Sequence, residues 1–170
     1  MRRIIAVILC VITAAALLTG CGTKPDFSFD KVICEYSWGG GFGTVLDTKS
    51  TSVTVYADKR VEVSSSGYTA EITITDEQLR SIIDTINANR VWEIGDISDY
   101  DVLDAGSQHI SLFDANGNEI YTCGGYAAGS MSSKGKRFSE TAAAICDPVH
   151  REVFVEVSHE ADKLLMGIYE

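Results

Sequence analysis

Four aspartates lie close together in one stretch of the chain and form its densest group of possible metal ligands. They are Asp96, Asp99, Asp101 and Asp104. Calcium takes roughly six to eight oxygen ligands, many of them carboxylates, so such a stretch could chelate the ion. The spacing matches no EF-hand loop, and a solvated acidic loop is the simpler interpretation. A calcium-responsive site at these aspartates therefore stays an alternative, and the sequence predicts no other metal site.

The histidines and serines do not form a recognisable catalytic pattern. The sequence has three histidines, His109, His150 and His159. His159-Glu160 lacks the second histidine of a metalloprotease helix, and His150 lies on the opposite side of the same predicted helix. Neither the GxSxG turn nor the SxxK motif of serine hydrolases occurs. The sequence favours a protein that is not an enzyme and needs no cofactor, with a hydrolase assembled only by the fold as an alternative.

The N-terminal segment carries the most specific pattern in the chain. Arg2 and Arg3 precede an apolar stretch from Ile4 to Leu18, and Leu18-Thr19-Gly20-Cys21 follows. An apolar run of about fifteen residues is short for a membrane-spanning helix, which needs about twenty, and suits a cleaved export signal. Leu18-Thr19-Gly20-Cys21 resembles the lipobox of bacterial lipoproteins.

This resemblance implies a modification, a cleavage and a location. Cys21 would carry a diacylglyceryl thioether, and the signal would be cut between Gly20 and Cys21. Each buried CH₂ of an acyl chain contributes about 0.8 kcal/mol, so two chains would hold the protein firmly on a membrane. We therefore expect a lipid-anchored protein on the extracytoplasmic face of the cell membrane. The expected organisation is a signal peptide at 1–20, a lipidated cysteine and tether at 21–30, and one domain at 31–170.

Three of the five cysteines remain in the predicted domain. They are Cys34, Cys123 and Cys146. In an extracytoplasmic compartment two of them could form a disulfide, and the sequence does not choose among the three pairings. The other interpretation is that all three are small buried apolar side chains.

The charge of the chain excludes one class of partner. The net charge is −10, and residues 1–20 contain two arginines and no acidic residue, so removing them leaves −12. Such a surface does not favour nucleic acid or anionic lipid. Membrane attachment would therefore depend on the acyl group of Cys21.

Alternating apolar and polar residues predict an antiparallel sheet of about five to six strands. The predicted strands are residues 31–38, 50–56, 60–64, 68–74, 107–113 and 119–123. The pairs Val53 with Val55 and Val61 with Val63 should face the same side. The Gly39–Gly43 run predicts a turn, and Asn116-Gly117 predicts a tight hairpin turn.

Two main helices are expected on one face of this sheet, which gives an α+β fold. Thr75 and Gln78 form a capping-box pattern at the start of the first helix. Apolar residues at steps of three or four, from Val149 to Ile168, predict the last helix, with Asp147-Pro148 at its start. A strand over residues 153–157 is the alternative. Residues 124–136 are predicted as an irregular loop, and residues 138–146 as a possible short helix.

Together these patterns favour a non-enzymatic lipoprotein that binds an unknown protein, peptide or envelope component. The strand, the GGGFG turn, the hairpin and the helix that begins with DEQL resemble small bacterial metalloprotease inhibitors of the emfourin type. That resemblance implies a protease-inhibitor-like module as a further alternative and assigns no residue.

Overall fold

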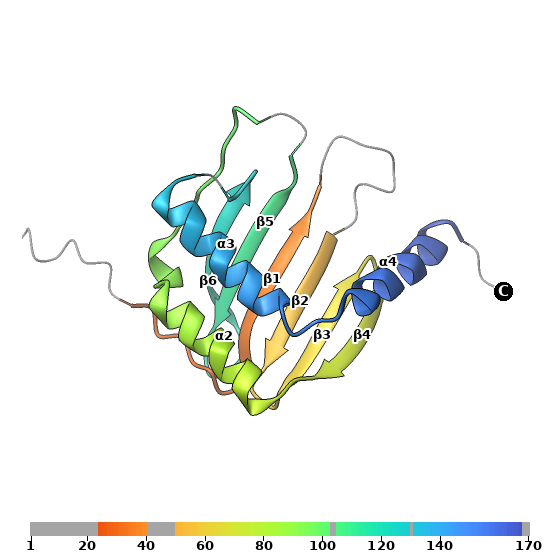
Figure 1. Cartoon of the computed structure of the whole chain (residues 1–170), viewed down its shortest axis with the longest axis horizontal. Coiled ribbons are helices and arrows are strands. Elements are labelled where there is room, and N and C mark those ends of the chain that lie inside the picture. Colours follow the sequence, from red (N-terminus) through yellow and green to blue (C-terminus); the bar gives the residue numbers. More distant parts are fainter. Residues whose placement is uncertain (1–23, 41–49, 103–104, 130, 168–170) are drawn as a thin grey trace, which may run out of the picture.

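The computed structural model describes residues 24–40, 50–102, 105–129 and 131–167, and these form an α+β fold (Figure 1). Six antiparallel strands make one sheet in the order β4-β3-β2-β1-β5-β6. The strands are β1 (Val32–Gly39), β2 (Ser50–Tyr56), β3 (Arg60–Ser65), β4 (Tyr68–Thr73), β5 (Ser107–Phe113) and β6 (Glu119–Tyr126). The helices are α2 (Asp76–Ala88), the short 3₁₀ helix η2 (Val91–Glu93), α3 (Ser133–Cys146) and α4 (Arg151–Leu165). The predicted fold class is confirmed.

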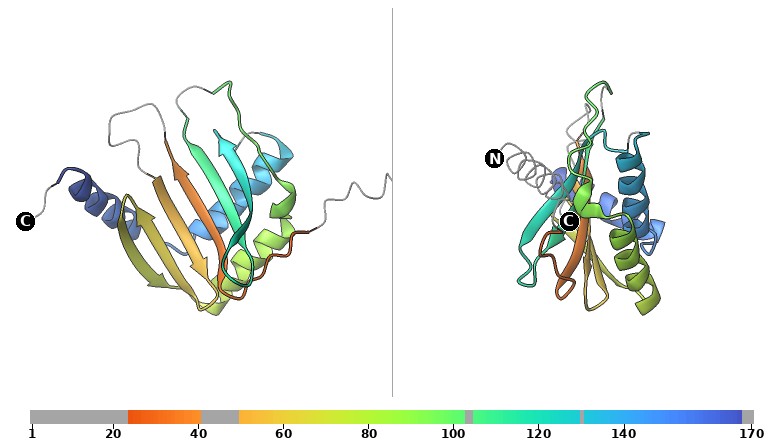
Figure 2. Two further views of the ribbon diagram at one scale, coloured as in Figure 1. Left: turned by 180° about the vertical axis from the view of Figure 1, so that it is seen from behind. Right: turned by 90° about the vertical axis from the view of Figure 1, so that its left-hand side faces the viewer.

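The alternation in the sequence places one apolar face of the sheet under the helices. Val53 pairs with Val63 and Val55 with Val61, and all four side chains are fully buried. On β1, Cys34 and Tyr36 pair with Val55 and Val53 and therefore share that face. Figure 2 shows that α2, α3 and α4 lie on this one side. Among the described residues, the helices therefore cover one face of the sheet, as is common for antiparallel sheets.

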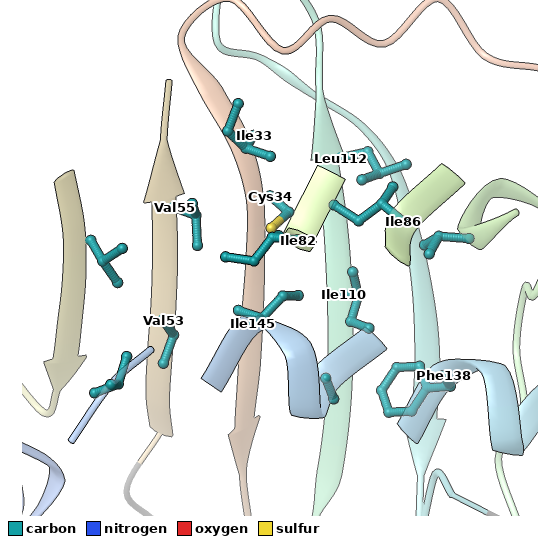
Figure 3. Packing of buried hydrophobic residues seen from close by; sticks show 14 of the residues in the cluster. Ile33, Cys34, Val53, Val55, Ile82, Ile86, Ile110, Leu112, Phe138 and Ile145 are labelled. Atoms are coloured by element: carbon teal, nitrogen blue, oxygen red, sulfur yellow. The ribbon is translucent and has the colours of Figure 1, made fainter. Parts of the chain in front are cut away.

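The first helix begins where the capping-box pattern predicts. The Thr75 side chain accepts a hydrogen bond from the Gln78 backbone N–H, and the Gln78 side chain accepts one from Thr75. Ile82 and Ile86 of α2 are buried one turn apart and pack onto the sheet. Figure 3 shows them beside Cys34 and Leu112. Each such side chain contributes about 1.5–3 kcal/mol by leaving water.

The described ranges contain three main helices, not the two that were predicted. Residues 124–136 are not one irregular loop, since β6 continues to Tyr126 and α3 begins at Ser133. The Ser132 side chain caps α3 by accepting a hydrogen bond from the Gly135 N–H. The predicted short helix at 138–146 is the second part of α3.

The predicted start of the last helix at Asp147-Pro148 is wrong. Asp147 is the C-terminal cap of α3, and α4 begins at Arg151 after His150. Pro148 and Val149 lie in the short connection between α3 and α4, and both are buried. The helical interpretation of residues 153–157, in contrast, is confirmed, because Val157 and Ala161 face the sheet one turn apart within α4.

The β5–β6 hairpin has a longer turn than the Asn116-Gly117 pattern predicts. Phe113 pairs with Glu119, so five residues, 114–118, connect the strands. The Asp114 carboxylate accepts hydrogen bonds from the backbone N–H groups of Asn116 and Asn118 and from the Asn118 side chain. Gly117 has a φ of 87°, which glycine adopts without strain. The side chain of Asp114 thus organises the turn.

The described part of the predicted tether packs against the domain. The Phe27 ring lies 5.3 Å from Phe29 and 5.3 Å from Trp92, measured between ring centroids. The Lys24 ammonium lies 4.3 Å from the centroid of Phe27 and 5.0 Å from that of Trp92. Ser28 N–H donates to Phe113 O at 2.9 Å. Residues 24–30 are therefore a docked segment and not a free linker.

Candidate functional site

An aromatic groove opens on the helix-covered side of the sheet. Its volume is about 540 Å³. It lies between the end of β1, the start of β5 and the first turn of α4. The residues that line it are Tyr36, Trp38, Gly39, Gly40, Gly106, Ser107, Gln108, Cys146 and Phe154. All of them are uncharged, which suits an uncharged ligand.

Three aromatic rings form the wall of this groove. Tyr36 and Trp38 alternate with Ser37 on β1 and stack with their centroids 5.1 Å apart. The Phe154 ring of α4 lies 5.9 Å from that of Trp38. Phe154 stands one turn before Val157, which is buried against the sheet, so the packing of α4 brings the ring to β1. Elements far apart in the chain thus build one apolar wall.

Polar groups lie at one end of the wall. The Tyr36 hydroxyl donates to Gln108 Oε1 at 2.8 Å, and Gln108 Nε2 donates to the backbone oxygen of Ala128 at 3.4 Å. Burial, together with the nearby Cys146 thiol, raises the pKa of Tyr36 to about 12, so the hydroxyl stays protonated. Apolar walls with a few fixed hydrogen-bonding groups are typical of small-molecule and side-chain binding sites.

The three cysteines of the domain, Cys34, Cys123 and Cys146, are free thiols, and no disulfide joins them. Burial raises the pKa of Cys146 to about 11 and that of Cys123 to about 12, and it raises the pKa of Cys34 as well. Thiols with such raised values are poor nucleophiles at neutral pH. All three thiols are free in this structure, and the disulfide stays a prediction for the exported protein.

A second concavity, the polar cleft, includes His109 of β5 and lies on the face of the sheet opposite to the described helices. Its volume is about 380 Å³. It lies over the start of β5 and the end of β6. Residues 95–99 run beside the end of β6 and extend the sheet there. Ile97 N–H donates to Gly124 O, and Asp99 N–H donates to Tyr126 O. The lining residues are Asp96, Ser98, Tyr100, Ser107, His109, Thr122, Cys123, Gly124, Gly125 and Tyr126.

Hydrogen bonds hold the Asp96 carboxylate in this cleft. Its Oδ1 accepts from the Ser98 hydroxyl at 2.6 Å and from the Ser98 backbone N–H at 2.9 Å. These bonds, with a smaller contribution from the nearby His109, lower the pKa of Asp96 below its ordinary value. Asp96 is therefore ionised at neutral pH.

Asp96, Ser98 and His109 lie in one cleft but do not form a catalytic triad. In a triad the serine hydroxyl donates to the histidine, and the aspartate orients that histidine. Here the Ser98 hydroxyl donates to Asp96 and accepts from the Tyr126 backbone N–H. The arrangement therefore fixes a carboxylate and does not activate a nucleophile.

Of the four predicted metal ligands, the three that lie among the described residues are not brought together into a metal-binding group. Asp96 lines the polar cleft, whereas the Asp99 carboxylate accepts a hydrogen bond from the Asp101 backbone within its own turn. Asp104 lies outside the described residues, as does Cys21. Within the described ranges no group of three or more acidic, histidine or cysteine side chains could hold a metal ion.

The sequence patterns did not indicate a site at Tyr36, Trp38 and Phe154. Part of the groove could have been recognised from the alternation of residues in β1, because it places Cys34, Tyr36 and Trp38 on one face. The position of Phe154 depends on where α4 begins. The predicted start, at Asp147-Pro148, was too early in the chain. His109, expected on a strand, does lie on β5 and lines the polar cleft.

No protein-family model matches the chain, and a search of curated proteins finds no match. Across the described ranges, no helix has the length and apolar character required to cross a membrane.

Proposed function

We propose that the protein is a lipid-anchored, extracytoplasmic binding module that works without catalysis. The aromatic groove would hold an uncharged, largely apolar part of its ligand, such as a hydrophobic side chain of a peptide. The observation that carries the binding function is a groove of about 540 Å³ whose lining residues are all uncharged and include three aromatic rings. The anchor rests on Leu18-Thr19-Gly20-Cys21, the segment that resembles a lipobox.

The chemistry of the two concavities supports binding over hydrolysis. In the groove the Tyr36 hydroxyl and the Cys146 thiol both have raised pKa values, so neither is an activated nucleophile. In the polar cleft the Ser98 hydroxyl is held by Asp96 and does not donate to His109. Aromatic rings of the kind found in the groove contribute strongly to recognition by contact alone.

Tryptophan fluorescence tests the groove. The sequence contains two tryptophans, Trp38 and Trp92, so Trp92→Phe leaves Trp38 as a reporter. The uncharged probe N-acetyl-phenylalaninamide should change this emission in a saturable way, and N-acetyl-aspartate amide should not. Phe154→Ala should weaken binding at least about fivefold, which corresponds to the loss of about 1 kcal/mol of aromatic contact.

Val155→Ala is the matched control, because Val155 is the next residue of α4 and its side chain is 58% exposed. It should bind the probe as the parent does. Equal weakening in both variants, or no saturable signal from the uncharged probe, would reject the groove as the ligand site.

Cell fractionation tests the anchor separately. Cys21→Ser should prevent lipid attachment and move the protein out of the membrane fraction, whereas Cys10→Ser, within the predicted signal, should leave it there. If Cys21→Ser remains membrane-bound with its leader cleaved as in the parent, the anchor proposal fails while the groove proposal is untouched.

A further inference from the structure

The polar cleft contains a carboxylate and aromatic rings, and His109 is the basic side chain among its lining residues. The Asp96 carboxylate is fixed through Oδ1, and no described residue donates a hydrogen bond to its Oδ2. The cleft-lining residues include no lysine or arginine. An ionised carboxylate with one oxygen available is a strong acceptor for a cationic donor.

Two tyrosines lie beside this carboxylate in the same cleft. The rings of Tyr100 and Tyr126 are parallel to within 7°, with centroids 6.0 Å apart. The Tyr126 hydroxyl accepts a hydrogen bond from the Ala105 backbone N–H at 3.0 Å, which fixes that ring. Tyr100 is 77% exposed, so much of its ring is available to a ligand. A planar cation can stack on such a ring.

Elsewhere on the same face of the sheet, a carboxylate and a tyrosine ring already bind an arginine of the chain itself. On β2 and β3 the Arg60 guanidinium carbon lies 3.8 Å from the centroid of the Tyr56 ring. Arg60 also pairs with Glu62, whose carboxylate accepts from the Tyr56 hydroxyl at 2.7 Å. The polar cleft offers the carboxylate and the tyrosine rings without the guanidinium.

We propose that the polar cleft binds the guanidinium group of an arginine side chain from a basic peptide. The guanidinium would donate to Asp96 and stack on Tyr100. The negative charge of the chain, −10 in total, would attract a basic peptide. This site shares only Ser107 with the lining of the aromatic groove and does not depend on the groove being occupied.

The probe is the tripeptide Gly-Arg-Gly, capped at both ends and titrated into the purified full chain. Its citrulline analogue has the same shape without the charge, and its lysine analogue has the charge without the planar fork. Amide chemical shifts of Gly124 and Gly125 report the cleft directly. The arginine peptide should bind at least about tenfold more tightly than the citrulline peptide, since hydrogen bonds to charged groups are about twice as strong as neutral ones. The lysine peptide should fall between them.

The variants separate the two contacts. Asp96→Asn keeps an Oδ1 acceptor for Ser98 and removes the charge, so it should weaken arginine binding at least about tenfold with the fold intact. Tyr100→Ala removes an exposed ring and should weaken binding several-fold. Asp84→Asn is the matched control, because Asp84 is an exposed aspartate on α2, on the opposite side of the sheet, and should not change binding.

Four outcomes would overturn the proposal. The first is no shift of the cleft amides with the arginine peptide up to about 20 mM, far above the dissociation constant of a useful site. The second is equal binding of the citrulline peptide, and the third is an equal effect of Asp84→Asn and Asp96→Asn, which would indicate general charge attraction. The fourth is a response of the same amides to methyl glucoside but not to the arginine peptide, which would assign the cleft to a saccharide.

Discussion

Gly125 lies directly under the side chains of Asp96 and Ser98. A Cβ atom added to Gly125 would stand 2.8 Å from Asp96 Oδ1 and 2.2 Å from Ser98 Oγ. The absence of a side chain on β6 thus allows residues 96–98 to approach the sheet and holds the carboxylate in the polar cleft.

Gly125→Ala should therefore displace Asp96 and Ser98. The φ of Gly125 is +137°, so an alanine is also strained, and the two effects together should lower the free energy of unfolding by roughly 1–3 kcal/mol. Gly67→Ala is the matched control, because Gly67 has a φ of +95° but nothing within 4 Å of the added Cβ. Urea denaturation measures both. A larger loss in Gly125→Ala confirms the close contact, and equal losses would mean that backbone strain alone is responsible.

Asp114 should stabilise the β5–β6 turn in a pH-dependent way. Asp114→Ala removes the acceptor for three hydrogen bonds and should lower the free energy of unfolding at pH 7. The bonds from Asn118, and then those from Asn116, hold the pKa of Asp114 below its ordinary value of 3.8. Because the folded-state pKa is lowered, this stabilisation is complete above pH 3.8 and is lost as the pH falls through the lower, folded value.

Unfolding curves of the parent and Asp114→Ala should accordingly converge as the pH is lowered from 7 to about 2. Asp58→Ala, at the exposed β2–β3 turn, gives a comparison in which one hydrogen bond from the Arg60 backbone N–H and a 4.0 Å ion pair with the Arg60 side chain are lost. A constant difference between the parent and Asp114→Ala across the pH range would show that the ionised carboxylate is not the stabilising group.

Alkylation should find three protected thiols in the folded protein. Cys34 and Cys123 are buried, and burial raises the pKa of Cys146 to about 11, so iodoacetamide should modify them far more slowly than in guanidinium chloride. Peptide masses assign each site without prior reduction. Recovery of two of these cysteines as a linked peptide pair would contradict the free thiols.

Phe27→Ala should release the docked segment. Phe27 contacts both Phe29 and Trp92, so its removal should let residues 24–30 detach more often. Chymotrypsin added to membranes should then cleave after Phe29 and release the domain several times faster than from the parent. Asp26→Ala, an exposed neighbour, should be cleaved at the parental rate. Equal rates for Phe27→Ala and the parent would show that the segment is already free.

The strands could be predicted because their information is local. Alternation within β2 and β3 gave Val53, Val55, Val61 and Val63 the right face, and the Thr75–Gln78 pattern gave α2 its start. The end of β6 could not be predicted, because Gly124 and Gly125 are typical of a loop. Their small size in fact lets two neighbouring segments approach the strand, a tertiary cause that the local pattern does not contain.

The two concavities were less predictable than the fold. Asp96 was singled out as a possible calcium ligand, and its cleft also contains His109 and Tyr126, which come from other elements. The groove requires Trp38 of β1 and Phe154 of α4 to meet, and that contact depends on how α4 packs. Periodicity specifies which side of an element is apolar, but it does not specify which distant side chain that side will meet.

The docked segment at residues 24–30 limits where this protein could act. Three residue steps separate Cys21 from Lys24, and a fully extended chain covers at most about 11 Å in that distance. With acyl chains on Cys21, as proposed, the domain could neither search a wide radius nor extend deep into the envelope. Any molecule that it captures would have to come within about one domain diameter of the bilayer. Lengthening the spacer before Lys24 would enlarge that radius and leave both binding surfaces unchanged.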